Sequence, residues 1–292
     1  QPAIILVLGD RVEPLAAVIA ASIMNIPVAH LGGGQSTGGI DNSIRHAITK
    51  FAHIHLARTP LHAKRLQQLG EEEWRIHTVG NVCLDTILNS KPIPQSDIAA
   101  KYSLDLSKPI ILVVFHSDTL DIESSIAQAR NLCEAIVELN EQTIFIYPNT
   151  DAGGREILGL IKETANHPNI QIHANIPQSD YYGIMRIADI LIGNSSSGST
   201  EAPAFKLPVV TIGDRQKGRD RFENSLAVTS EKKQIMKTVK MILTDDEYRE
   251  KLRNCSEMYG DGKTGERIAQ ILAEIAITSE LTRKNDKLLM DS

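Results

Sequence analysis

The amino-acid sequence predicts an α/β protein built from two Rossmann-like, doubly wound parallel-sheet domains, of which the first is incomplete. Three observations predict this class. Short apolar runs such as IILVL at 4–8 lack the alternation of half-exposed strands, which is typical of strands covered on both faces. Between the runs lie helical patterns, for example the i, i+3, i+4, i+7 spacing of apolar residues over 44–51. The 292 residues exceed the size at which one hydrophobic core is usual, so two domains are expected.

Seven apolar runs are predicted to be strands of two parallel sheets joined by right-handed crossovers. They lie at 4–8, 27–31, 54–57, 110–115, 143–147, 190–193 and 208–212. Thr59 and Pro60 have the residue types of a helix N-cap and a first helical position, and Gly70 has the type that follows a helix end. The sequence therefore predicts a helix between these residues.

The strand–helix rhythm pauses once, over 88–108, where proline, serine and charged residues accumulate. We place the domain boundary there, with a first domain at 1–90, a second at 91–262 and a helical C-terminal tail at 263–292. The first domain then has about three strands, which is few for a doubly wound sheet. Since the first residue is also not methionine, we expect further strand–helix units upstream.

Composition argues against several classes of function. The 31 Lys and Arg residues are outnumbered by 36 Asp and Glu, for a net charge of −5, so no basic excess is available to hold nucleic acid. Cys83, Cys133 and Cys255 lack CxxC or metal-ligand spacing, which favours reduced thiols in a cytoplasmic protein without a metal site. No apolar run approaches the roughly 20 residues of a membrane span, and no signal-peptide pattern opens the chain.

Polar residues follow six of the predicted strands. They are Gly9, Asp10 and Arg11; His30 with glycines 32–34; His116 and Asp118; Asn149 and Asp151; Asn194 to Ser197; and Gly213 with Arg215. Because the carboxyl ends of parallel strands meet at one edge of a sheet, these residues are expected to line a ligand cleft between the two domains.

The segment IGNSSSGSTEAPAFKLP at 192–208 is the strongest single element. A strand, a Gly/Ser turn and a helix start follow one another, so backbone N–H groups and serine hydroxyls converge where a phosphate fits. Glu201 is placed to accept hydrogen bonds from a ribose diol. The alternative is a flexible Ser/Gly linker, which is seldom held between two buried strands. Neither GxGxxG nor GxxxxGK[ST] is present, so no dinucleotide cofactor or P-loop is indicated.

Other polar residues keep two interpretations each. Arg215 and Arg219 are anion ligands or solvated surface charges. His116 is a general acid or base near neutral pH, or a structural histidine. Asp41 precedes a helical pattern and is either a site residue or an N-cap worth about 1 kcal/mol.

At six of these segments the chain resembles the UDP-N-acetylglucosamine 2-epimerase family. They read GDRVE, TGGIDNSIRHAITKFAHIH, QLGEEEWRIHTVGN, YPNTDAGGRE, GNSSSGSTEAPAF and PVVTIGDRQKGR, and they extend from residue 7 to about residue 228. The IDNSIRHAITK and NTDAG segments resemble the hydrolysing branch, which releases UDP and a sugar of the N-acetylmannosamine type, as in sialic-acid biosynthesis. The resemblance implies a GT-B-like pair of Rossmann domains and a homodimer that needs no cofactor.

The resemblance also implies roles for particular residues. In the nucleotide part of the site, Ser195, Ser196 and Glu201 hold the UDP moiety and Arg215 holds the diphosphate. Arg11 and Asn149, which also follow predicted strands, are added to this UDP-binding set. The residues expected to line the sugar and do the chemistry are Asp10, Asp41, Arg45 and His116.

The chain departs from the family pattern on the catalytic side. Where the family reads His-x-(Glu or His)-Gly-Gly-Glu, this chain reads HLGGGQ, so that Gly32 and Gln35 replace acidic or polar positions. The segment FHSDT likewise differs from the usual His-Pro-Val-Thr. These changes favour substrate binding over full activity, because losing one general acid or base typically removes 10²–10⁴ of rate.

The implied reaction eliminates UDP with loss of the C2 proton to give a glycal, and water and a proton then add to give the 2-epimeric sugar. Two proton transfers on opposite faces need at least two titratable groups, which Asp10, Asp41 and His116 supply. The alternatives are a catalytically impaired UDP-sugar-binding homologue, a non-hydrolysing 2-epimerase and a GT-B glycosyltransferase.

Overall fold

The computed structural model describes residues 2–219, 223–253 and 260–284, and these form two compact units. The first unit holds residues 2–89 together with 260–284, and the second begins at Ser90. Each unit contains one parallel β-sheet with helices packed against it, so the predicted α/β class is confirmed.

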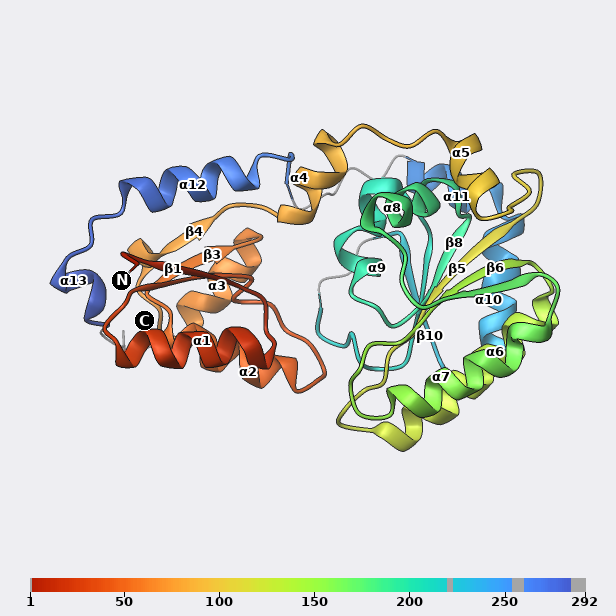
Figure 1. Ribbon diagram of the computed structural model, residues 1–292, viewed down its shortest axis with the longest axis horizontal. Helices are drawn as coiled ribbons and strands as arrows, with labels where there is room; N and C mark the ends of the chain where they lie inside the picture. Colours follow the sequence, from red (N-terminus) through yellow and green to blue (C-terminus); the bar gives the residue numbers. More distant parts are fainter. Residues whose placement is uncertain (1, 220–222, 254–259, 285–292) are drawn as a thin grey trace. The chain divides into compact units, whose positions relative to one another are not determined.

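The first unit has a four-stranded sheet with the order β1-β2-β3-β4, in which all neighbours are parallel (Figure 1). Its strands are β1 (Ile5–Leu8), β2 (Val28–Leu31), β3 (Ile54–Ala57) and β4 (Ile76–Thr78). Its helices are α1 (Val12–Ile23), α2 (Asp41–Phe51), α3 (Pro60–Gln68), the 3₁₀ turn η1 (Glu73–Arg75), α4 (Val82–Asn89), α12 (Thr264–Glu274) and α13 (Ser279–Thr282). The three predicted strands are confirmed, and β4 is an additional one.

Helix α3 begins and ends at the residues that the sequence indicates. The Thr59 side chain accepts a hydrogen bond from the His62 backbone N–H at 3.1 Å, and Pro60 occupies the first helical position. Gly70 follows the last residues of the helix with a φ of +88°, the left-handed conformation that glycine adopts without strain.

Residues 260–284 pack on the first unit, whereas the sequence predicts 260–262 in the second domain and 263–292 in a helical tail, of which 285–292 lie outside the described residues. Asp85 accepts hydrogen bonds from the Thr264 and Gly265 backbone N–H groups at 3.0 and 2.6 Å, and so satisfies the first turn of α12. Ile268 and Leu281 are buried in the same cluster as Ala29 and Leu56. Such contacts join segments about 200 residues apart, which local sequence patterns do not reveal.

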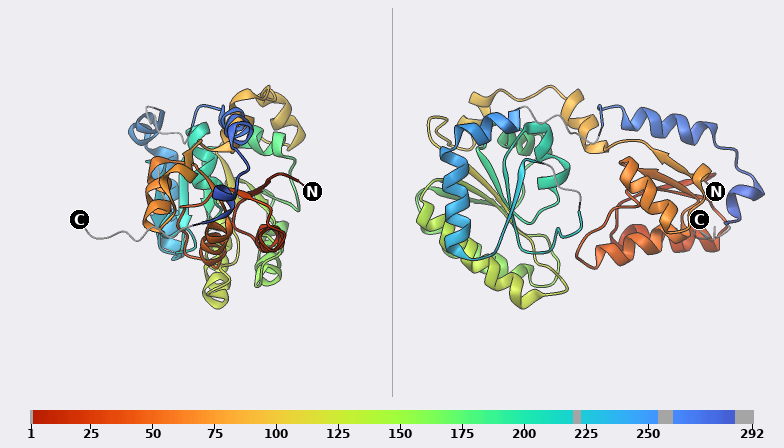
Figure 2. Two further views of the ribbon diagram at one scale, coloured as in Figure 1. Left: turned by 90° about the vertical axis from the view of Figure 1, so that its left-hand side faces the viewer. Right: turned by 180° about the vertical axis from the view of Figure 1, so that it is seen from behind.

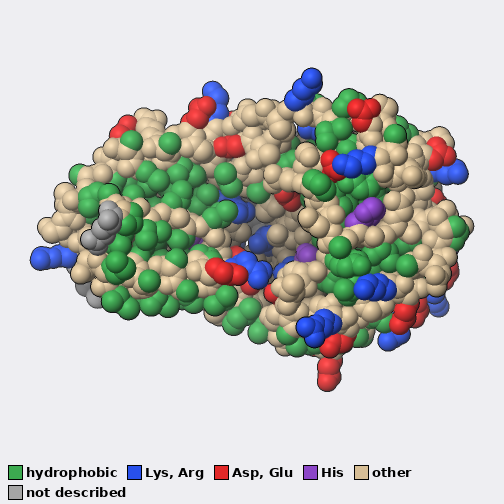
Figure 3. Space-filling view, in the orientation of Figure 1, with side chains coloured by type: hydrophobic (Ala, Val, Ile, Leu, Met, Phe, Trp, Pro, Cys, Tyr) green, Lys and Arg blue, Asp and Glu red, His purple; other side chains and the backbone are tan. Residues whose placement is uncertain are grey.

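The free edge and outer surface of the first unit are apolar. Leu6 and Leu8 on β1 are 46% and 55% exposed, and α1 exposes Val12, Ile19 and Ile23. Figure 3 shows hydrophobic side chains gathered over this part of the unit. A neighbouring strand or helix normally covers an edge of this kind. The expectation of further units upstream stays a prediction.

The second unit has a six-stranded parallel sheet with the order β10-β9-β8-β5-β6-β7 (Figures 1 and 2). Its strands are β5 (Ile110–Val114), β6 (Gln142–Ile146), β7 (Ile170–His173), β8 (Ile190–Gly193), β9 (Val209–Ile212) and β10 (Ser225–Val228). The order turns back between β5 and β8, so the chain leaves these neighbours in opposite directions. In open α/β sheets, ligands bind at such a point, beyond the carboxyl ends of the strands.

Helices cover both faces of this sheet, as Figure 2 shows from behind. They are α5 (Gln95–Lys101), α6 (Ile122–Leu139), α7 (Gly154–Glu163), η2 (Thr164–Asn166), α8 (Gln178–Ile187), α9 (Ser197–Thr200), η3 (Ala202–Phe205), α10 (Lys232–Thr244) and α11 (Asp246–Arg253). The main core lies between the sheet and α6, α7 and α10. Among the described residues, no helix is both long enough and apolar enough to span a membrane.

Candidate functional site

In the first unit the predicted sugar-site residues Asp10 and Arg45 lie together. Asp10 follows β1, and its carboxylate forms an ion pair with Nη2 of Arg45 from α2. The Arg45 side chain is only 1% exposed, and its Nη1 also donates to the Gln35 carbonyl and to Asn42 Oδ1 at 3.3 and 3.1 Å. A buried guanidinium with several acceptors holds its partner carboxylate in a defined position.

His30 on β2 fixes the turn that carries Asp10. Its Nε2 lies 2.8 Å from the Gly9 carbonyl oxygen, and its side chain is fully buried. Burial lowers the pKa of His30 from 6.5 to about 4, so the ring is neutral at neutral pH. Because Nε2 faces a carbonyl oxygen, Nε2 carries the hydrogen. Sequence reasoning placed His30 beside the glycines without a role; its signal is a histidine inside an apolar strand run.

At Gly32 and Gly34 the backbone admits no acidic replacement without strain. A Cβ on Gly34 would lie 2.2 Å from the His62 carbonyl oxygen. Gly32 has room around its Cα, but its φ of +106° disfavours any side chain. Gln35 is buried, and with its amide oxygen turned to Arg58 it accepts hydrogen bonds from Nε and Nη1 at 3.1 and 3.2 Å. Gln35 thus serves as a buried partner for a cation.

Asp41 and Arg11 occupy the remaining predicted positions of this unit. Asp41 is the first residue of α2, and the N-cap position falls on Ile40, so the interpretation of Asp41 as an N-cap is wrong. Arg11 is exposed and forms an ion pair with Glu13 at 3.5 Å. The predicted contact of Arg11 with UDP stays a prediction.

In the second unit, Asn194 joins the loops at the carboxyl ends of β5 and β8. Its Oδ1 accepts from the His116 backbone N–H at 2.7 Å, and its Nδ2 donates to the His116 carbonyl at 2.8 Å. Arg215, which follows β9, donates from Nη1 to the Asn194 carbonyl at 3.0 Å. The predicted residues His116, Asn194 and Arg215 therefore meet where the strand order reverses.

The His116 ring is held as a neutral donor. Its Nδ1 accepts from the Asn149 backbone N–H at 3.1 Å, so in the neutral ring Nε2 carries the hydrogen. Burial, with a smaller contribution from the nearby Arg215 cation, lowers the pKa of His116 from 6.5 to about 4. The sequence alone predicts a group that titrates near neutral pH; the buried setting instead leaves a neutral hydrogen-bond donor.

These histidines make stability fall in acid. Above pH 6.5 each histidine is neutral in both the folded and the unfolded chain, so its lowered pKa does not affect stability. Between pH 6.5 and about pH 4 the histidine binds a proton in the unfolded chain but not in the folded one, so the free energy of unfolding falls. We expect the urea midpoint to fall across this pH window and the free energy of unfolding to decrease by about 2 kcal/mol or more. His30→Gln is expected to flatten the slope; an unchanged slope would contradict the assignment.

The segment at 192–208, called the serine segment below, lies next to two tyrosines of α8. Ser195 Oγ and Ser197 Oγ are 2.8 Å apart, and the Tyr181 hydroxyl donates to Ser197 Oγ at 3.0 Å. The Tyr182 hydroxyl donates to Glu201 Oε1 at 3.1 Å. The predicted helix start is the four-residue α9, so the dipole of a long helix is absent here and hydroxyl and N–H groups must supply the donors. The exposed Ser196 lies in the same turn.

A cavity of about 510 Å³ opens at this end of the sheet. Its lining comes from the loops after β5, β8, β9 and β10 and from the first turns of α6, and it includes Asn194, Gly213, Arg215 and Ser125. In the part of the chain that the structure describes, no three His, Cys, Asp or Glu side chains are grouped to hold a metal ion. The cavity therefore offers amide, hydroxyl and guanidinium groups to a ligand, together with the carboxylates of Asp118, Asp121 and Asp214.

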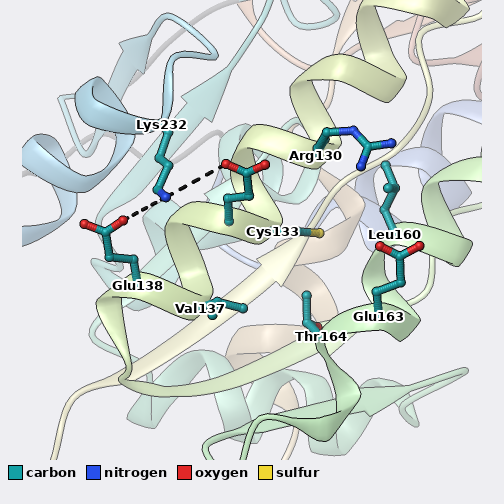
Figure 4. A pocket seen from close by; sticks show the side chains of 9 residues that line it. Arg130, Cys133, Val137, Glu138, Leu160, Glu163, Thr164 and Lys232 are labelled. Carbon is teal, nitrogen blue, oxygen red and sulfur yellow. Dashed lines mark ion pairs between the residues drawn. The ribbon is translucent and has the colours of Figure 1, made fainter.

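A second cavity of about 590 Å³ lies on the helical surface of the same unit, between α6, α7 and α10 (Figure 4). Glu163 and Thr164 lie at the C-terminal end of α7, which is the end near the amino termini of the strands. Burial raises the pKa of the Cys133 thiol to about 12, so it is not a reactive thiolate. Lys232 is paired with Glu138 at 2.7 Å. This cavity therefore lies near the amino termini of the strands, and we do not assign it as the ligand site.

The chain is similar to known proteins in both sequence and structure. The model of the UDP-N-acetylglucosamine 2-epimerase family matches residues 1–273. The UDP-N,N'-diacetylbacillosamine 2-epimerase (hydrolyzing) of Legionella pneumophila is 37% identical over 283 residues, which are 97% of this chain and 74% of that protein. The GDP/UDP-N,N'-diacetylbacillosamine 2-epimerase (hydrolyzing) of Campylobacter jejuni is 36% identical over 228 residues, which are 77% of this chain and 59% of that protein.

Solved structures share the fold at lower identity. The UDP-GlcNAc 2-epimerase of Neisseria meningitidis bound to UDP-GlcNAc has a TM-score of 0.81 at 20% identity, over 94% of this chain and 77% of that one. The enzyme of Methanocaldococcus jannaschii, in complex with UDP-GlcNAc and UDP, has a TM-score of 0.75 at 21% identity, over 93% and 76% of the two chains. The predicted GT-B-like fold class is thereby confirmed. With a family model that covers nearly its whole length, the chain belongs to the UDP-N-acetylglucosamine 2-epimerase family.

Proposed function

We propose that this protein is a hydrolysing 2-epimerase that converts a UDP-linked 2-acetamido sugar to UDP and the free 2-epimeric sugar. The observation that carries the proposal is the 37% identity, over 97% of the chain, to a relative described as hydrolyzing. Two relatives act, by their descriptions, on N,N'-diacetylbacillosamine nucleotides. A UDP-diacetamido sugar is therefore the first candidate substrate, and UDP-N-acetylglucosamine is the second.

The second unit supplies the proposed UDP site. Ser195, Ser196 and Arg215 donate to the diphosphate and Glu201 accepts from the ribose, and Asn149 is a further proposed contact of UDP. In support, Arg215 is tied to the Asn194 carbonyl, directly before the serines, and Glu201 is oriented by the Tyr182 hydroxyl. Guanidinium and hydroxyl donors of this kind suit phosphate oxygens.

The first unit supplies most of the proposed chemistry. In the first step a base removes the C2 proton, the C–H electron pair forms the C1–C2 double bond of a glycal, and the C1–O electrons leave with UDP. Water then adds its hydroxyl at C1, and C2 takes a proton on the opposite face. Asp10, oriented by Arg45, and Asp41 are the proposed proton-transfer groups. The neutral His116 donates from Nε2 to the developing charge.

The test is to incubate the protein with UDP-N,N'-diacetylbacillosamine and with UDP-N-acetylglucosamine in D₂O and to follow the products by NMR. Release of UDP with a free 2-epimeric sugar that carries deuterium at C2 is the expected result. A 2-epimer that keeps its UDP indicates a non-hydrolysing epimerase, and sugar transfer to an added acceptor indicates a glycosyltransferase. Either outcome contradicts the proposal.

A second candidate is a catalytically impaired UDP-sugar-binding protein, and Gly32 and Gln35 motivate it. Under the proposed function, Gln35→Glu changes kcat less than about threefold, because the carboxylate merely pairs with Arg58. Under the second candidate the same change raises the rate by about 10²-fold or more. Steady-state UDP release distinguishes them. Gln35→Met, which removes the acceptor, serves as the matched control, and Gly32→Glu is unsuitable because of its backbone.

The setting of the reaction is also a proposal. We infer a cytoplasmic homodimer that takes part in nucleotide-sugar metabolism of the sialic-acid type, with no nucleic-acid or membrane partner and no cofactor. The sequence resemblance and the acidic composition support this.

A further inference from the structure

Three hydroxyl groups form a chain that runs from α8 to the serine segment. The Tyr181 hydroxyl donates to Ser197 Oγ at 3.0 Å, and Ser197 Oγ lies 2.8 Å from Ser195 Oγ. The Ser197 backbone N–H also donates to Ser195 Oγ, at 3.4 Å. Ser197 is 6% exposed, whereas Ser195 is partly exposed. The chain of hydrogen bonds therefore begins at the Tyr181 phenol on α8 and ends at the Ser195 hydroxyl, which is open to a ligand.

The direction in which the hydroxyl groups donate along this chain of hydrogen bonds is set by Tyr181. Burial and the nearby Glu201 carboxylate raise the pKa of Tyr181, so the phenol keeps its hydrogen and donates it. Ser197 Oγ then accepts from Tyr181 and turns its own hydrogen to Ser195. Ser195 Oγ consequently accepts from both Ser197 groups, and its own hydrogen is left for a ligand.

Without the phenol, nothing fixes this direction. Ser197 is buried, so water does not easily replace the lost donor, and Ser195 is then free to turn its hydrogen inward to Ser197 Oγ. A ligand phosphate would meet a lone pair of Ser195 in place of a hydrogen. Hydrogen bonds to charged acceptors are among the stronger ones in proteins, so the orientation of one hydroxyl affects affinity measurably.

We propose that Tyr181 is a positioning residue for the diphosphate, acting through Ser197 so that Ser195 donates its hydroxyl hydrogen to a phosphate oxygen of UDP. The inference rests on the proposed function, which assigns UDP to this segment. It adds a residue outside the serine segment whose hydroxyl has no other evident purpose in the site. Tyr182, its neighbour, acts on Glu201 and hence on the ribose end.

The experiment is a double-mutant cycle on UDP affinity, measured by isothermal titration calorimetry with the full chain. Tyr181→Phe, which keeps the ring, is expected to weaken UDP binding about 5- to 30-fold. Ser195→Ala is expected to weaken it by a similar factor. The double variant is expected to bind UDP no more weakly than Ser195→Ala alone, because Tyr181 acts only through that hydroxyl.

The matched control is Tyr182→Phe, whose effect should add in full to that of Ser195→Ala. Wild-type affinity in Tyr181→Phe overturns the inference, and so do effects of Tyr181→Phe and Ser195→Ala that simply add. If the unmodified protein binds no UDP, the proposed function itself has failed. Thermal melting of each variant without ligand confirms that all are folded.

Discussion

Asp10→Asn is expected to lower kcat for UDP release by about 10²–10⁴, the usual effect of removing a general acid or base. The amide still accepts a hydrogen bond from Arg45 but no longer takes a proton from carbon. UDP affinity is expected to stay within about twofold, because all the proposed UDP groups except Arg11 belong to the other unit of the chain. Steady-state kinetics and calorimetric titration with UDP measure the two quantities.

Arg45 complicates this variant in a way that can be measured. Its guanidinium is buried, and without the Asp10 carboxylate its charge is compensated less well, so Asp10→Asn also lowers stability. Assays are therefore run well below the melting temperature of the variant. Glu13→Gln, which removes an exposed carboxylate from the same segment, is the control and keeps its activity. Near-normal kcat in Asp10→Asn would refute the assigned role.

An edge position accounts for the strands that the sequence does not reveal, although β1, an edge strand that is apolar throughout, is predicted. All seven predicted strands are present, and six of them are apolar on both faces in their sequence and lie inside a sheet or beside its centre. The three that were missed, β4, β7 and β10, are each at a sheet edge. They read IHT, IQIH and SLAV, where solvent on one side permits polar residues and interrupts the apolar run.

The candidate site also contains residues that the sequence indicates and residues that only the folded structure indicates. Polarity just after a predicted strand is enough to propose Asp10, His116, Asn149 and Arg215 as site residues, because the carboxyl ends of parallel strands meet at one edge of each sheet. His30 and Tyr181 were given no role, since their importance lies in contacts to Gly9 and Ser197 that only the folded chain makes. The pKa of His116 was likewise out of reach, because burial lowers it and burial is a property of the tertiary structure.

Arg75 binds three backbone carbonyls of residues 280–283, and Arg75→Met is expected to destabilise the first unit by about 3–5 kcal/mol. The guanidinium is 1% exposed and donates to the carbonyls of Leu281, Glu280 and Arg283 at 2.8, 3.1 and 2.8 Å. Methionine fills a similar volume but removes the donor to these carbonyls and the ion pair with Glu72. Urea unfolding followed by circular dichroism measures the loss.

Arg249→Met provides the matched comparison, because the ion pair that Arg249 forms among the described residues is an exposed i,i+3 pair with Asp246, whose loss should cost less than about 0.5 kcal/mol. Limited proteolysis adds a local measurement. If Arg75 holds the segment down, cleavage between α12 and α13 becomes faster in Arg75→Met while cleavage within the second unit does not change. If the rate of cleavage between α12 and α13 is the same in Arg75→Met as in the unmodified protein, the apolar contacts of Ile268 and Leu281 hold the segment without the guanidinium.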